Sequence, residues 1–165
     1  KPIFDFIREK GLKALALNLP KKIVSKIART GLEALPAEDK LYLPGDLKVT
    51  TNERYIAFVH GSFDGQMADM FKFENYLAAM SAWNETMGAG MAKFLNANPG
   101  YAGLVAAGSG HVIFNAGIPA SIASRAPGLR QVSFYPQPAA SCPAALPAGD
   151  AGLADYVWYK DYASR

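Results

Sequence analysis

The clearest pattern of apolar and polar positions is a stripe at helical spacing in the middle of the chain. Its members recur at alternating intervals of four and three residues: Phe73, Leu77, Met80, Asn84, Met87, Met91 and Phe94. This spacing predicts a long helix over Met67–Asn96 with one continuous buried face. Asn84 is the polar member, and a buried polar group that finds no partner costs about 1–3 kcal/mol. Gly88 and Gly90 are poor helix formers, which indicates that another segment packs closely against them.

Shorter segments of the chain predict helices that alternate with apolar strands. We expect further helices over Lys1–Lys10, from Pro20 to Gly31, over Asn52–Val59 and from Gly117 to Arg125. We expect strands over Leu12–Leu17, Leu104–Ala107, Gln131–Tyr135 and Asp155–Tyr159. Residues 36–48 and the proline- and alanine-rich residues 136–153 are expected to be loops.

This alternation predicts a single α/β domain over residues 1–165, with a layered sheet of mostly parallel strands flanked by helices. The chain opens inside a helix–strand unit, so we expect this sheet to be incomplete at its N-terminus. The length and a hydrophobic content of 50% are sufficient for one well-buried domain.

The segment that suggests chemistry is Gly108-Ser109-Gly110-His111, directly after the apolar run Leu104–Ala107. That run is typical of a strand buried on both faces, and ligands of open α/β sheets bind beyond the carboxyl ends of such strands. His111 could there act as a ligand, a proton carrier or a hydrogen-bond donor. The alternative is a histidine that is hydrogen-bonded for structure alone.

A second polar feature, the Asn84–Thr86 turn of the long helix, is expected to face His111. Glu85 would then lie within reach of His111, directly or through water. In the alternative arrangement, Asn84 caps a neighbouring backbone group and Glu85 points to solvent.

Charge is unevenly distributed along the chain, although the net charge is only +3. Residues 1–30 hold eight Lys and Arg against Asp5 and Glu9, and the remainder has an excess of three acids. A basic end could face phosphate, anionic lipid or ligand carboxylates, or could simply be a solvated helix face. Nucleic acid is not expected, because the cations are not interleaved with stacking aromatic residues. No stretch approaches the roughly 18 apolar residues of a membrane span, and Cys142 has no second cysteine as a partner.

Five blocks occur in an order that resembles a known family. They are Leu15–Pro20, Trp83-Asn84-Glu85-Thr86-Met87, Gly108-Ser109-Gly110-His111-Val112, Gly117-Ile118-Pro119 and Ala154-Asp155-Tyr156-Val157-Trp158. In this order they resemble the ChaN-like haem-binding lipoproteins of bacteria. The resemblance implies an α/β domain that captures haem for iron transport, in the periplasm or on an outer membrane through a lipidated N-terminus. It also implies a homodimer, a possible outer-membrane receptor, and membrane contact only through a lipid anchor that is not present in this sequence.

The resemblance further implies that haem is held between two subunits with a tyrosine oxygen on the iron. Tyrosine suits ferric iron, whereas histidine suits either oxidation state. The ligand tyrosine should lie exposed at an apolar subunit surface, which favours Tyr55 or Tyr76 over Tyr42. His60 is expected to end its helix, and the resemblance implies that either His60 or a lysine of the partner subunit lies near the haem propionates. The cofactor-binding candidates are therefore Tyr55, Tyr76, His60, His111, Asn84 and Glu85.

Two departures from the family bear on the alternative function. The wider superfamily includes erythromycin esterase-like enzymes and Tiki metalloproteases, which carry an early Gly-Glu-x-His block that this sequence lacks. The family usually has Asp at the position of Asn84 and Gln at the position of Met80. The alternative is a metal-assisted or acid–base hydrolase that uses His111 and Glu85, and both departures argue against it. A third possibility is an interaction domain without either activity.

Overall fold

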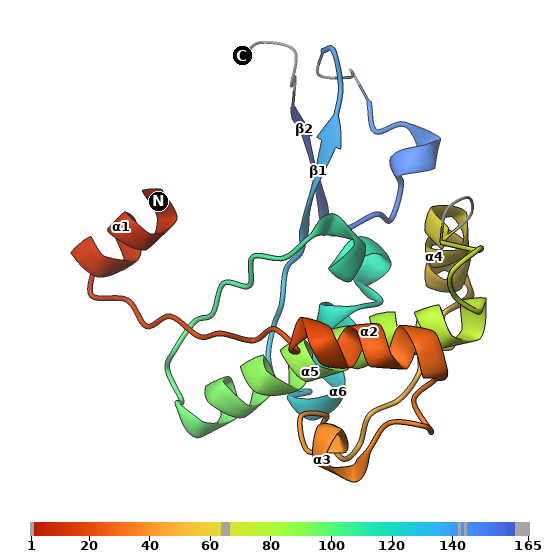
Figure 1. Ribbon diagram of the computed structural model, residues 1–165. Helices are drawn as coiled ribbons and strands as arrows, with labels where there is room; N and C mark the ends of the chain where they lie inside the picture. Colours follow the sequence, from red (N-terminus) through yellow and green to blue (C-terminus); the bar gives the residue numbers. More distant parts are fainter. Residues whose placement is uncertain (1, 64–66, 142, 144, 161–165) are drawn as a thin grey trace.

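The computed structural model describes residues 2–63, 67–141, 143 and 145–160, and its helices are arranged around α5, Phe73–Ala97. Helix α5 begins six residues after the expected start at Met67. Helices α2, Lys21–Thr30, and α6, Ile118–Arg125, pack along it (Figure 1). Helix α4, Glu53–Phe63, contacts it as well. The predicted stripe is confirmed, because four of its members are buried: Leu77, Asn84, Met87 and Met91.

The close packing predicted at the helix glycines is confirmed. A Cβ atom on Gly88 would lie 2.3 Å from the Oγ atom of Ser121 in α6. On Gly90, a Cβ atom would lie 3.1 Å from a methyl group of Leu17. A side chain at Gly88 would therefore force α5 and α6 apart, and this explains why the helix accepts a poor helix former there.

In the described part of the chain, three apolar clusters surround α5. The first joins Leu19 and α2 to Ala78, Ala79 and Ala82. The second joins Tyr55 and Val59 of α4 to Leu77, Ile113 and Leu153. The third joins Met87 and Met91 to Ile118 and Ile122 of α6. The burial of apolar surface on several sides of α5 makes this helix the centre of the packed region.

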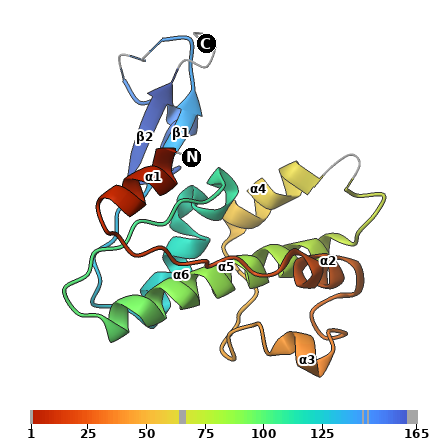
Figure 2. The same cartoon turned by 60° about the vertical axis from the view of Figure 1, so that its left-hand side comes forward.

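Among the described residues, the sheet consists of two parallel strands, β1, Phe134–Pro138, and β2, Tyr156–Lys160, paired from Phe134 opposite Tyr156. This ribbon extends away from α2, α5 and α6 (Figures 1 and 2). The predicted α/β class is confirmed as a two-stranded parallel sheet with helices beside it. Because β1 runs to Pro138, the loop expected over 136–153 begins later, and it contains a short 3-10 helix, Ala148–Asp150. Cys142 lies outside the described residues.

The strands predicted over Leu12–Leu17 and Leu104–Ala107 are wrong. Both segments are extended, but neither pairs with a strand of the described part of the chain. Leu17 and Val105 pack against the third apolar cluster, whereas Leu104 is 92% exposed rather than buried. Apolar composition indicates that a segment favours a sheet, but only a neighbouring strand can bury both of its faces.

The remaining elements differ from the predictions in small ways. Helix α1, Pro2–Glu9, lies where a helix was expected and has no buried residue. A single-turn helix α3, Ala37–Lys40, interrupts the predicted loop over 36–48. Helix α4 continues past His60 to Phe63, so His60 lies inside its last turn rather than at its end. Within the described ranges, no helix combines the length and apolar character that a membrane span requires.

Candidate functional site

His111 and the Asn84–Thr86 turn face one another, as predicted. His111 is the last residue of a 3-10 helix, Ser109–His111, and its Nδ1 atom lies 2.7 Å from Oδ1 of Asn84. Asn84 is only 4% exposed, so its amide requires hydrogen-bond partners within the protein. The polar member of the α5 stripe therefore meets the histidine that follows the glycine loop.

The amide of Asn84 is bonded on its other side to a buried tyrosine. Its Nδ2 atom donates to the hydroxyl of Tyr55 at 2.8 Å, and that hydroxyl donates to the backbone carbonyl of Gly110 at 2.9 Å. We call this chain of hydrogen bonds, from the Gly110 carbonyl through Tyr55 and Asn84 to His111, the neutral relay. Burial raises the pKa of Tyr55, so its hydroxyl keeps its proton at neutral pH.

The imidazole of His111 is half-buried, and burial lowers its pKa. Its ring lies 5.0 Å from the ring of Trp83 at an interplanar angle of 66°. The Nε2 atom makes no hydrogen bond with the described residues. Among these residues, the fully buried side-chain atom that lacks a hydrogen-bond partner is Oδ1 of Asn115, not Nε2 of His111. Nε2 is therefore unbonded and is not fully buried. A neutral imidazole in this arrangement offers a lone pair to a ligand.

The backbone around His111 is closely fitted. A Cβ atom on Gly117 would lie 2.3 Å from the carbonyl oxygen of His111. Phe114 and Asn115 have φ values of 60° and 55°, a region that non-glycine residues adopt at some cost. Strained backbone of this kind persists only where the surrounding structure holds it in place. The neighbouring segments thus fix the position of the histidine.

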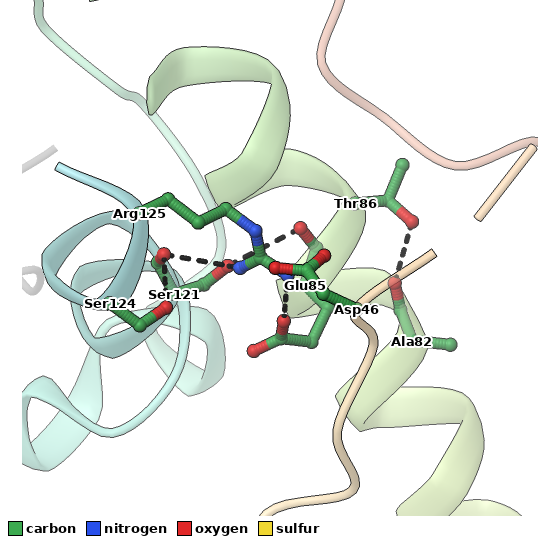
Figure 3. A network of polar contacts seen from close by, with 7 residues as sticks. All are labelled: Asp46, Ala82, Glu85, Thr86, Ser121, Ser124 and Arg125. Atoms are coloured by element: carbon green, nitrogen blue, oxygen red, sulfur yellow. Dashed lines mark hydrogen bonds and ion pairs between the residues drawn. The ribbon is translucent and has the colours of Figure 1, made fainter. Parts of the chain in front are cut away.

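Glu85 belongs to a different cluster, which corrects the expectation that it approaches His111. Its Oε2 atom lies 2.6 Å from Nη2 of Arg125, which also lies 2.7 Å from the carboxylate of Asp46 (Figure 3). Arg125 also donates from Nη1 to the Oγ atom of Ser121 at 2.6 Å. We call this group the charged network. Although burial opposes it, hydrogen bonding to Asp46 and Glu85 raises the pKa of Arg125.

The tyrosines favoured as iron ligands are not exposed. Tyr55 is 0% exposed and its hydroxyl is bonded twice, so its place in the structure differs from the expected surface position. Tyr76 is half-buried, with its ring 5.3 Å from that of Phe63. Tyr42 is 50% exposed, with Lys22 Nζ 5.9 Å from its ring centre. His60 is exposed, and its ring contacts that of Phe73 at 4.7 Å.

The sequence did not predict the contacts of four residues in these clusters, which are Tyr55, Trp83, Arg125 and Asp46. Tyr55 was expected as a ligand, although its spacing of four from Val59 already indicated a buried helix face. Trp83 precedes Asn84 in sequence but was not connected with His111. Arg125 and Asp46 lie 79 positions apart, and no local pattern predicts that they pair.

One comparison with known proteins identifies the family of this chain. Residues 1–122 match the family described as "Haem-binding uptake, Tiki superfamily, ChaN". That range includes every residue of the neutral relay and ends just before Arg125. Among curated proteins and solved structures, none matches the chain. Since the match covers well over half of the 165 residues, the chain belongs to the haem-binding ChaN family of the Tiki superfamily.

Proposed function

We propose that this protein is a non-catalytic haem carrier of bacterial iron uptake, and that the Nε2 atom of His111 is its donor to the iron. One observation carries this proposal. His111 is held by Asn84 through Nδ1, whereas Nε2 has no partner among the described residues and is not fully buried. A histidine ligand is commonly held in this way, with its second nitrogen bonded to a neighbouring acceptor.

The surroundings of His111 fit a histidine that would hold the iron of haem. Burial lowers the pKa of His111, which keeps the imidazole neutral, and only the neutral ring can donate a lone pair to iron. Trp83 supplies an aromatic wall beside the imidazole. Haem, when bound, would supply a flat apolar surface, a metal that accepts the lone pair, and propionates that favour cationic partners.

The finer features implied by the family are part of this proposal. The carrier would be anchored at the outer membrane or located in the periplasm, and would hold haem between two copies of the chain. In such a dimer, His111 of one copy and a tyrosine of the other copy would both hold the haem iron. Of the three tyrosines considered from the sequence, Tyr42 has the accessibility that this role requires.

The test is a haem titration of the whole chain, followed by the Soret band. His111→Gly removes the donor and leaves a space for free imidazole. We expect this variant to bind haem at least 10-fold more weakly, since one lost metal ligand costs at least as much as a lost supporting residue. Added imidazole should restore the wild-type spectrum. An unchanged titration for His111→Gly would contradict the proposal.

His60→Gly is the matched control, because it removes the other histidine of the chain from an exposed helix position. We expect unchanged haem affinity and no response to imidazole. A loss of affinity equal to that of His111→Gly would show that the histidine in α4 takes part in binding.

The hydrolase alternative lacks a supporting observation. It required Glu85 beside His111, but the carboxylate of Glu85 is bonded to Arg125. The described residues contain no group of three or more His, Cys, Asp or Glu side chains placed to hold a metal ion.

A further inference from the structure

The hydrogen bonds of the neutral relay have a fixed direction, and this direction determines where the proton of His111 resides. The first group of the relay is the backbone carbonyl of Gly110, which is an acceptor only. The hydroxyl of Tyr55 lies 2.9 Å from that oxygen and is the donor to it. Tyr55 is completely buried, so no water competes for its single proton.

The direction then passes to Asn84. Because the hydroxyl of Tyr55 has given its proton to Gly110, it can only accept a hydrogen bond from Asn84 at 2.8 Å. The amino group of Asn84 must therefore face Tyr55, and the amide oxygen must face His111. The opposite orientation of the amide would place two acceptors, the amide oxygen and the hydroxyl oxygen, against each other.

The direction ends at the imidazole ring. The amide oxygen of Asn84 is an acceptor only, and it lies 2.7 Å from Nδ1 of His111. Nδ1 must therefore carry a proton, and in the neutral ring Nε2 must carry the lone pair. In the opposite tautomer, two lone pairs would meet at 2.7 Å and Nε2 would offer a proton to the ligand instead.

We infer that Tyr55 and Asn84 are positioning residues which hold His111 in the Nδ1–H tautomer, so that Nε2 is prepared as a donor before any ligand arrives. The value of this arrangement for haem rests on the proposed function above. The tautomer itself does not, since it is a property of the haem-free chain. Tyr55 contributes through a hydrogen bond two groups away from the imidazole, without touching a ligand.

The contacts around the ring support a fixed orientation. Trp83 packs against one side of the imidazole, with its own Nε1 atom donating to Asn18. A Cβ atom at Gly108 would lie 3.7 Å from Cδ2 of His111, so the loop that precedes the histidine lies close to the ring as well. These contacts leave the hydrogen bond to Asn84 as the interaction that distinguishes the two ring nitrogens.

The experiment is nitrogen-15 NMR of the haem-free chain, which identifies the protonated ring nitrogen of each histidine from its chemical shift. The His60→Gln variant assigns the two histidines. We expect the wild-type His111 to carry its proton on Nδ1 and Tyr55→Phe to lose this preference, with a mixture of tautomers. Tyr135→Phe is the matched control, because Tyr135 packs against the same apolar cluster and is not part of the relay.

Two results would overturn the inference: a wild-type His111 protonated on Nε2, or a folded Tyr55→Phe variant with an unchanged tautomer. The wild-type spectrum decides the first even if Tyr55→Phe does not fold. A haem titration of Tyr55→Phe gives a second readout, with an expected loss of affinity of about 10-fold. If the tautomer is as inferred but haem does not bind to the wild-type chain, the proposed function fails and the inference about Tyr55 stands.

Discussion

Asn84 and Glu85 are neighbours on α5, but their side chains belong to two clusters of opposite character. Asn84 is part of the neutral relay, which contains no charged side chain and ends at an unbonded nitrogen of His111. Glu85 is part of the charged network, in which Arg125 is bonded to two carboxylates and a serine hydroxyl. In the charged network, Arg125 is hydrogen-bonded to partners within the protein. In the neutral relay, Nε2 of His111 remains without a partner among the described residues.

This difference separates a group that holds the fold from a group that is prepared for a ligand. Arg125 joins three segments, since Asp46 lies in the loop before α4, Glu85 in α5 and Arg125 itself in α6. Because its Nη1 and Nη2 atoms both donate to groups within the protein, Arg125 has few hydrogen-bond donors left for another molecule. The hydrogen bonds of the neutral relay serve only to orient the imidazole of His111. The comparison can be tested by altering one cluster at a time.

The largest effect on stability is expected in the charged network. Arg125→Met should lower the free energy of unfolding by about 3 kcal/mol, because it leaves Glu85 partly buried without its counterion. Urea unfolding measures this loss. Haem affinity should remain that of the wild type, since Arg125 is not part of the neutral relay. Arg130→Met, at an exposed position, is the control and should change stability little. A loss of haem binding in a folded Arg125→Met variant would remove the distinction between the clusters.

A free-energy change smaller than that of Arg125→Met is expected when a charged side chain is introduced into the neutral relay. Asn84→Asp places a carboxylate beside Nδ1 of His111, and an adjacent negative charge stabilises the imidazolium form. The pKa of His111, which burial lowers in the wild type, should therefore rise in this variant. An NMR titration of the ring protons measures the change. If the pKa of His111 stayed below that of an unperturbed histidine, the carboxylate would not be facing the ring.

The smallest expected effect is the pH dependence of the free energy of unfolding that His111 causes in the wild-type chain. Burial lowers its pKa below the ordinary value of 6.5, so the unfolded chain binds a proton at a higher pH than the folded chain. The contribution of His111 to stability is therefore fully present above about pH 6.5 and is lost as the pH falls toward the folded pKa. Unfolding measured between pH 8 and 5 should show this decline, and His111→Gln should reduce it. An identical decline in both proteins would assign it to other groups.

The helices were predictable from sequence because their signals are local. The spacing of Leu77, Asn84 and Met91 defines the buried face of α5 without any knowledge of its partners. The meeting of Asn84 with His111 was also predictable, because both are polar groups placed in apolar surroundings. Strand pairing was not, because the same apolar run Leu104–Ala107 is compatible with a paired strand and with an extended segment.

The roles of individual polar side chains were harder to predict. Glu85 could have approached His111, but Arg125 provides a stronger partner from a position 40 residues away. Tyr55 has both a ring that favours burial and a hydroxyl that favours a hydrogen bond, and the sequence does not show which partner that hydroxyl finds. Long-range pairing of this kind follows from the packing of α4, α5 and α6, which no local pattern contains.

The extended segments Leu12–Leu17 and Leu104–Ala107 have a practical consequence for the purified protein. Their backbone groups are not paired with a strand of the described chain, and Leu104 presents nearly its whole side chain to solvent. Unpaired extended segments with exposed apolar residues are templates for association between copies of a chain. We therefore expect the isolated 165-residue chain to become turbid at high concentration. A lysine in place of Leu104 should improve its solubility without disturbing the hydrogen bonds of His111.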